Sequence, residues 1–127
     1  MSHKIVVVED NPDLASIYQT RMNLAGYACS VAGDGITAVY VIQTERPSLV
    51  LLDLMVPAIS GDEVLRRMRA SDWGKEIPVI IISNLSEDDA PKGLRELGIT
   101  GYLVKANLVG DDLVQAVNKV LPPEQKK

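Results

Sequence analysis

The chain has 127 residues, of which 46% are hydrophobic and 24% charged, enough for one globular domain with one core. We expect a single domain over 1–127, with a core from 4 to 121 and a polar tail from 122 to 127. The net charge of −4 argues against a standing attraction to nucleic acid or to an anionic membrane. With one cysteine, no signal-peptide layout and no apolar stretch long enough to span a bilayer, a cytoplasmic protein is expected.

Five short apolar runs predict β-strands, in chain order over residues 4–8, 27–31, 49–53, 77–82 and 100–104. The first, third and fourth runs are continuous rather than alternating, which is typical of strands covered on both faces of a parallel sheet. The second is less apolar, so it is expected nearer an edge. The third run ends in a carboxylate, Asp53, and the Pro57 and Gly61 that follow predict that the strand stops there.

The segments between these runs have apolar residues at helical spacing, which predicts helices. Asn11-Pro12 has the pattern of an N-cap followed by proline at the first helical position, and Gly26 predicts the end of that helix. Asp34 is expected to cap a second helix. Ser60 and Glu63 have the spacing of a capping box at the start of a third.

The fourth helix has a weaker pattern because Pro91 would remove one of its hydrogen bonds. We expect regular helix only from about 88–90, with Leu94 and Leu97 buried and Gly98 as the stop. A last helix is predicted from 111–112 to 121. Strands alternating with helices predict an α/β fold, a three-layer (βα)5 doubly wound parallel sheet. At this length the flavodoxin-like strand order 2-1-3-4-5 is expected.

Polar residues stand at the carboxyl ends of four of the predicted strands: Glu9 and Asp10, Asp53, Ser83, and Lys105. Each could be an ordinary strand-end residue or helix cap. In a doubly wound sheet, however, these strand ends lie side by side and share one crevice.

Three carboxylates in one crevice repel each other unless a cation joins them, and their oxygens are the ligands that Mg²⁺ prefers. The absence of a His or Cys cluster argues against zinc. A carboxylate can also act as a nucleophile and form an acyl phosphate. Mg²⁺, Lys105 and the Ser83 hydroxyl would then neutralise the phosphoryl oxygens.

This set resembles the receiver domain of two-component response regulators, of the single-domain chemotaxis-regulator type. The resemblance covers residues 4–121 and is carried by Val8-Glu9-Asp10-Asn11, Leu52-Asp53-Leu54-Met55-Val56-Pro57 with Gly61, Ile82-Ser83-Asn84 and Tyr102-Leu103-Val104-Lys105.

The resemblance implies that Asp53 is the phosphoacceptor. It implies that Asp10 ligates Mg²⁺ directly, Glu9 largely through water, and Met55 through its carbonyl. Ser83 would move to meet the phosphoryl group and Lys105 would pair with it. Tyr102 matches the aromatic switch residue that turns inward when Ser83 moves, and the alternative, an exposed aromatic on a strand with no such role, stays open because a single aromatic is weak evidence.

The same resemblance implies a signalling protein rather than an enzyme, one that catalyses only its own phosphorylation and autodephosphorylation. The only histidine, His3, precedes the first strand, so the phosphoryl group should come from a histidine kinase, a phosphotransfer protein or a small phosphodonor. The output partner would bind the fourth helix, fifth strand and fifth helix. A monomer or a weak phosphorylation-dependent dimer is expected. Whether the chain acts alone or is a fragment of a longer regulator stays open.

The chain departs from the family pattern at several positions. Ala106 stands where the family has a cis proline, and a non-proline cis bond costs about 2.5–4 kcal/mol, so we expect a trans 105–106 bond. Asn84 replaces a small residue and could crowd or hydrogen-bond the phosphoryl site. Met55 and Leu85 are apolar and cannot orient a water, which predicts a long-lived phosphorylated state.

Two rivals share only part of the pattern. A flavodoxin would need a phosphate-binding loop where Glu9 and Asp10 stand, and a haloacid-dehalogenase-type phosphatase would need a second aspartate at Met55. The serious alternative is a receiver-fold interaction module that works without phosphorylation, and it is the departures at Asn84 and Ala106 that keep it open.

Overall fold

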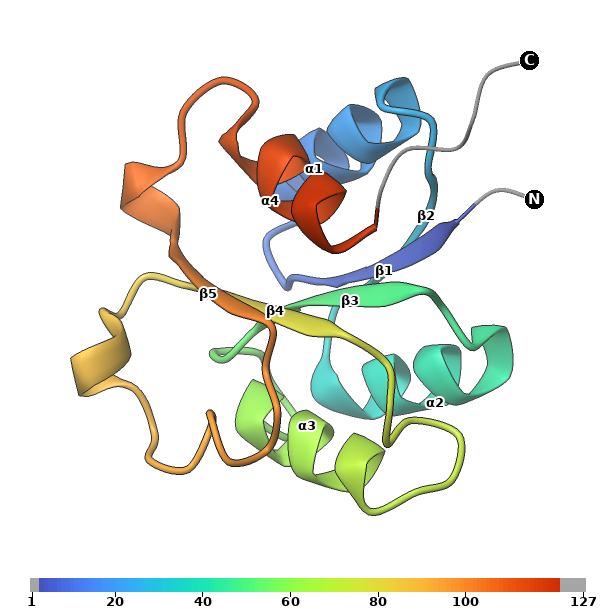
Figure 1. The fold of residues 1–127 in the computed structure, drawn as a ribbon, viewed down its shortest axis with the longest axis vertical. Coiled ribbons are helices and arrows are strands. Elements are labelled where there is room, and N and C mark those ends of the chain that lie inside the picture. Colours follow the sequence, from blue (N-terminus) through green and yellow to red (C-terminus); the bar gives the residue numbers. More distant parts are fainter. Residues whose placement is uncertain (1–2, 122–127) are drawn as a thin grey trace.

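Five parallel strands form the middle layer of the computed structural model, which describes residues 3–121 (Figure 1). The strand order is β2-β1-β3-β4-β5, as predicted. In chain order the strands are β1 (Lys4–Val8), β2 (Ala28–Ala32), β3 (Leu49–Asp53), β4 (Val79–Ser83) and β5 (Gly101–Val104). The helices are α1 (Pro12–Leu24), α2 (Gly35–Glu45), α3 (Gly61–Arg69) and α4 (Asp112–Val120), with two 3-10 turns, η1 (Glu87–Asp89) and η2 (Lys105–Asn107).

Helices cover both faces of the sheet, α1 and α4 on one and α2 and α3 on the other (Figure 1). Successive side chains of a strand point to opposite faces, so each central strand contributes to two cores. Val6 and Val50 pack with α2 and α3, whereas Ile5 and Leu51 pack with α1 and α4, and all four are fully buried. This two-sided burial is the reason that the central strands are continuously apolar.

The first two helices begin as their sequences predict. Asn11 Oδ1 accepts hydrogen bonds from the N–H groups of Asp13 and Leu14, and Asp34 Oδ1 accepts one from Thr37 N–H. The prediction of a capping box at the start of the third helix is wrong. Ser60 is the N-cap residue of α3 but makes no side-chain capping bond, and the Glu63 carboxylate accepts hydrogen bonds from Arg66 and Arg67 instead of reaching back to the cap.

The prediction of a fourth helix starting at about 88–90 is wrong as well. Only η1 is regular in this segment, and turns follow it. Pro91 has no N–H to donate, and Gly93 has a φ of +91°, a left-handed conformation that interrupts a right-handed helix. Leu94 is nevertheless buried as expected, while Leu97 is half-buried against the same core.

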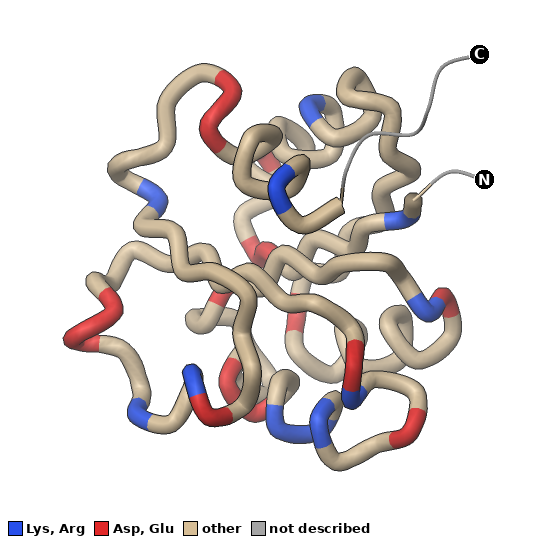
Figure 2. Tube along the Cα trace, viewed as in Figure 1, with Lys and Arg blue, Asp and Glu red and all other residues tan. Residues whose placement is uncertain are grey.

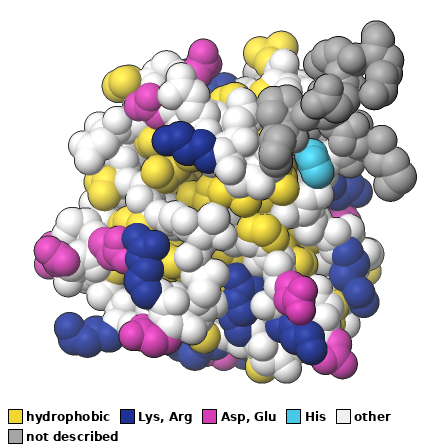
Figure 3. Space-filling view, in the orientation of Figure 1, with side chains coloured by type: hydrophobic (Ala, Val, Ile, Leu, Met, Phe, Trp, Pro, Cys, Tyr) yellow, Lys and Arg dark blue, Asp and Glu magenta, His cyan; other side chains and the backbone are white. Residues whose placement is uncertain are grey.

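The edges of the sheet are β2 and β5, so the lower apolar content of residues 27–31 did indicate an edge strand. Figure 3 shows hydrophobic side chains at the surface between β5 and α4, where the β5 residues are half-buried. Cys29 lies in β2, and burial raises the pKa of its thiol to about 12, which fits a packing role.

Charged residues of both signs are spread along the trace (Figure 2). No helix among the described residues is long and apolar enough to cross a membrane. The predicted polar tail, 122–127, lies outside the described residues.

Candidate functional site

The sheet brings the predicted site residues to one edge. Asp53 is the last residue of β3, Glu9 and Asp10 directly follow β1, Ser83 ends β4 and Lys105 directly follows β5. A cleft opens there, lined by Glu9, Asp10, Asn11, Leu14, Tyr18, Asp53, Met55, Asn84, Lys105 and Ala106. Four of the five predicted side chains therefore line one cleft, and the fifth, Ser83, lies beside it.

Close approach of α3 to the end of β3 depends on Gly61. Its N–H donates a 2.9 Å hydrogen bond to the carbonyl of Leu54. A Cβ at this position would lie 2.2 Å from the backbone oxygen of Asp53, so only glycine allows the helix to start so near the strand. Gly61 thus positions the loop that carries Met55 into the cleft.

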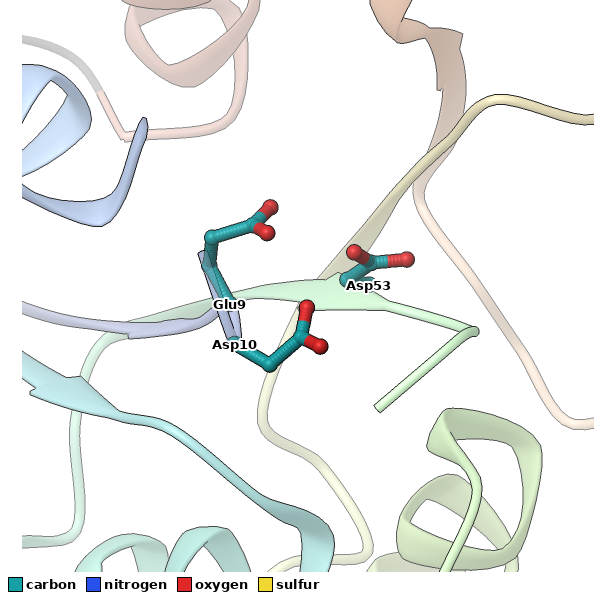
Figure 4. A group of neighbouring side chains, drawn as sticks. All are labelled: Glu9, Asp10 and Asp53. Carbon is teal, nitrogen blue, oxygen red and sulfur yellow. The ribbon is translucent and has the colours of Figure 1, made fainter. Parts of the chain in front are cut away.

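The three carboxylates form one group (Figure 4). One oxygen from each of Glu9, Asp10 and Asp53 lies within 4.8 Å of the others. Glu9 and Asp53 are 2% and 3% exposed, whereas Asp10 is exposed. Backbone N–H groups hold the two buried carboxylates in place: Asn11 N donates to Glu9 Oε2 at 3.1 Å and Met55 N to Asp53 Oδ1 at 3.0 Å.

Lys105 provides the positive charge of the cleft. Its Nζ lies 2.7 Å from Glu9 Oε1 and 2.7 Å from Asp53 Oδ2. Burial lowers the pKa of this ammonium, but the two carboxylates outweigh that effect and leave the pKa raised. Lys105 is therefore a permanent cation that bridges β1, β3 and β5 across the sheet.

One ammonium does not compensate three carboxylates. Burial raises the pKa of Glu9 more than Lys105 and the Asn11 N–H lower it, with Asp53 adding to the rise. Glu9 Oε1 is buried and contacts Lys105 as an ion pair whose angles fall outside those of a hydrogen bond. The site has excess negative charge and carboxylate oxygens as ligands, and Asp10 is accessible from solvent. These features fit a hard divalent cation such as Mg²⁺, which Glu9, Asp10 and Asp53 could hold.

Ser83 is fully buried, and its hydroxyl accepts a 3.1 Å hydrogen bond from Leu85 N–H. It does not line the cleft; the exposed Asn84 does. Tyr102 is half-buried on β5 and donates from its hydroxyl to the carbonyl of Leu85 at 2.9 Å. Ser83 and Tyr102 therefore share one neighbour, Leu85, through its N–H and its C=O.

The loop after β5 has the predicted trans 105–106 bond, since no cis peptide bond occurs among residues 3–121. It forms the short turn η2, closed by a 3.1 Å hydrogen bond from Leu108 N to Lys105 O.

Sequence reasoning missed two residues of the cleft, Leu14 and Tyr18, both on α1. Leu14, Tyr18 and Met22 have helical spacing, which is typical of a side that faces the core, and Tyr18 and Met22 do pack there. Spacing carries no signal that a core-facing side chain also reaches a neighbouring cleft, so a sequence reading had no means of finding them.

Comparison with known proteins agrees with this geometry. The chain matches the family described as "Response regulator receiver domain" over residues 5–118. It is 34% identical over 122 residues to sporulation initiation phosphotransferase F of Bacillus subtilis (strain 168), with 96% of each chain covered.

Two solved structures illustrate the likeness. The receiver domain of a Francisella response regulator is 30% identical with a TM-score of 0.82, over 94% of this chain and 96% of that one. The receiver domain of a sensor histidine kinase from Pseudomonas aeruginosa PAO1, with a magnesium ion in its active site cleft, is 27% identical with a TM-score of 0.79, over 94% and 97% of the two chains. The chain belongs to the response regulator receiver domain family.

Proposed function

We propose that this protein accepts a phosphoryl group on Asp53 from a histidine kinase or a phosphotransfer protein, in a Mg²⁺-dependent reaction, and signals through a changed surface. Residues 4–121 would act as one receiver domain. The observation that carries the proposal is the position of Asp53, buried between the Lys105 ammonium and two further carboxylates at the base of an open cleft.

In the proposed reaction an Asp53 carboxylate oxygen attacks the phosphorus of a phosphohistidine. The O–P bond forms as the P–N bond breaks, and the histidine nitrogen keeps the electron pair and takes up a proton. The product is an acyl phosphate on Asp53. The Lys105 ammonium lies 2.7 Å from the attacking carboxylate. It can turn toward the negatively charged phosphoryl oxygens once they are bonded to Asp53.

Glu9, Asp10, Asp53 and the Met55 carbonyl would hold Mg²⁺. The ion supplies charge neutralisation at the transferred phosphoryl group. Glu9 would take part only through this ion, since its two oxygens contact the Lys105 ammonium and the Asn11 N–H.

Signalling would begin at Ser83. Moving its hydroxyl toward a phosphoryl group breaks the hydrogen bond from Leu85 N–H, and Leu85 also holds Tyr102 through its carbonyl. The surface that would change consists of the segment after β4, β5 and α4. Phosphorylation would shift a population between two arrangements, and an output protein would bind one of them.

The test is intact mass after incubation with acetyl phosphate and Mg²⁺, for the wild type, Asp53→Asn and the control Asp72→Asn. Asp72 is a fully exposed aspartate in the loop after α3. A Mg²⁺-dependent gain of one phosphoryl group in the wild type and the control, absent in Asp53→Asn, is expected. A gain that persists in Asp53→Asn would assign the acceptor to another residue.

The second candidate, a module that works without phosphorylation, is favoured by one observation. Asn84, where the family has a small residue, stands at the cleft and could obstruct a phosphoryl group. No gain of mass with acetyl phosphate or with a histidine kinase as donor, together with amide chemical shifts that do not respond to Mg²⁺, would support this module instead.

A further inference from the structure

We propose that Tyr18 is a positioning residue for Lys105: its hydroxyl accepts a hydrogen bond from the ammonium when Asp53 carries a phosphoryl group. The inference rests on the proposed function, because it concerns the state in which Asp53 has been modified.

Tyr18 lies in the middle of α1 and is 6% exposed. It lines the acidic cleft and also the adjoining pocket between α1 and the loop after β5, and Lys105 lines both as well. Side chains on a helix lean toward its N-terminus, which in α1 is the end nearest the carboxyl ends of the strands. The phenol of Tyr18 therefore extends from the core toward the Lys105 side of the cleft.

The Tyr18 hydroxyl makes no hydrogen bond to another residue within 3–121. Two other tyrosines with buried or half-buried rings, Tyr27 and Tyr102, do have partners for their hydroxyls. Glu9 Oε1 is the only fully buried side-chain oxygen or nitrogen within 3–121 that lacks a hydrogen-bond partner, so the Tyr18 oxygen keeps some contact with solvent and is free to accept a hydrogen bond. Burial raises the pKa of Tyr18, and the charges of Lys105, Glu9 and Asp53 all act on it, so the group is a neutral phenol close to these three residues.

The ammonium of Lys105 has three N–H donors. One donates to Asp53 Oδ2, and the ammonium also lies 2.7 Å from Glu9 Oε1 as an ion pair. Once an Asp53 oxygen is bonded to phosphorus in the acyl phosphate, that carboxylate loses its negative charge and the ammonium must turn to the phosphoryl oxygens. Because Tyr18 and Lys105 line the same two pockets, the phenol oxygen can accept a remaining N–H and restrict the orientation of the ammonium. Phenylalanine would fill the same space without that acceptor.

The rate of phosphorylation by acetyl phosphate and Mg²⁺ tests this role. In the reaction the bond from Asp53 oxygen to phosphorus forms and the bond from phosphorus to acetate breaks, with acetate keeping the electron pair; Tyr18 gains and loses no proton. Time courses of intact mass are compared for the wild type, Tyr18→Phe, Lys105→Met and the double variant. Tyr40→Phe is the control, because Tyr40 is 70% exposed on α2.

We expect Tyr18→Phe to slow phosphorylation about tenfold, the size of effect of one hydrogen bond to a charged group. Tyr40→Phe should leave the rate unchanged. In the Lys105→Met background the Tyr18 substitution should have no further effect, because its action passes through the ammonium. A structural role would instead lower the rate in both backgrounds, and that result would overturn the proposal, as would a Tyr18→Phe rate equal to that of the wild type.

A second measurement applies if the Lys105 variant reacts too slowly to time. The ¹³Cζ resonance of Tyr18 is followed as Mg²⁺ and beryllofluoride, a tetrahedral phosphoryl analogue, are added to the wild type. A shift of this resonance, with none for Tyr40, is expected, and an unmoved Tyr18 resonance would overturn the inference. A wild type that no phosphodonor modifies would instead contradict the proposed function itself.

Discussion

Replacing Lys105 with methionine tests whether this ammonium is the counter-ion on which the two buried carboxylates depend. The Lys105 side chain is 12% exposed, and those of Glu9 and Asp53 are 1% and 4% exposed. Methionine keeps most of the length and the apolar stem of lysine but removes the charge. We therefore expect the variant to fold with a lower free energy of unfolding in the absence of divalent cations.

The magnitude follows from the distances. Each 2.7 Å contact has a gross attraction of about 6 kcal/mol at an effective dielectric constant of about 20. Desolvation of the charges offsets most of this, and breaking a buried pair costs about 3–5 kcal/mol. Because the cleft is open to water on the side of Asp10, we take the lower end, about 3 kcal/mol. With a urea m-value of about 2 kcal/mol/M, the midpoint should fall by about 1.5 M.

The assay is urea unfolding at neutral pH with a chelator present. The control is Lys75→Met. Lys75 lies 3.7 Å from Asp72, but both side chains are exposed, so this ion pair should contribute nothing measurable to the free energy of unfolding. Added Mg²⁺ should recover part of the stability that Lys105→Met loses. If Lys105→Met is no less stable than Lys75→Met, the reasoning about an uncompensated pair of buried carboxylates is refuted.

Three further predictions concern the same cleft. Burial raises the pKa of Glu9 above its ordinary 4.5, so the folded state binds this proton more tightly than the unfolded state does. The free energy of unfolding should therefore fall as pH rises from 4.5 through the raised pKa, and the urea midpoint of Glu9→Gln should not show this fall. Gly61→Ala should cost about 1–3 kcal/mol in thermal unfolding, since its Cβ would lie 2.2 Å from backbone, whereas Gly33→Ala, with nothing within 4 Å, should change stability little. Met55→Asn combined with Leu85→Glu should speed loss of the phosphoryl group; an unchanged decay by mass would contradict a role for these apolar residues in its lifetime.

Much of this protein could be predicted from local patterns. Continuous apolar runs predicted β1, β3 and β4, because strands covered on both faces need apolar side chains at every position. Asp53 and Lys105 were identifiable because a carboxylate that ends one strand and an ammonium that directly follows another lie at the same end of a parallel sheet. The prediction of a fourth helix was wrong because Leu94 is buried from a turn rather than from a helix, so its burial does not require helical structure. The left-handed conformation of Gly93 also interrupts a helix at this point.

Only the tertiary structure decided which side chains meet in the cleft. The 2.7 Å contact of Lys105 with Asp53 joins residues on different strands, and its length depends on strand register and rotamers that no local pattern encodes. Burial of Ser83 beside the cleft, with Asn84 lining it, is decided in the same way. Helical spacing determined that Tyr18 faces the core. That its hydroxyl end also reaches the cleft depends on how α1 packs across β1, because periodicity specifies the face of a helix and not what lies beyond the end of a side chain.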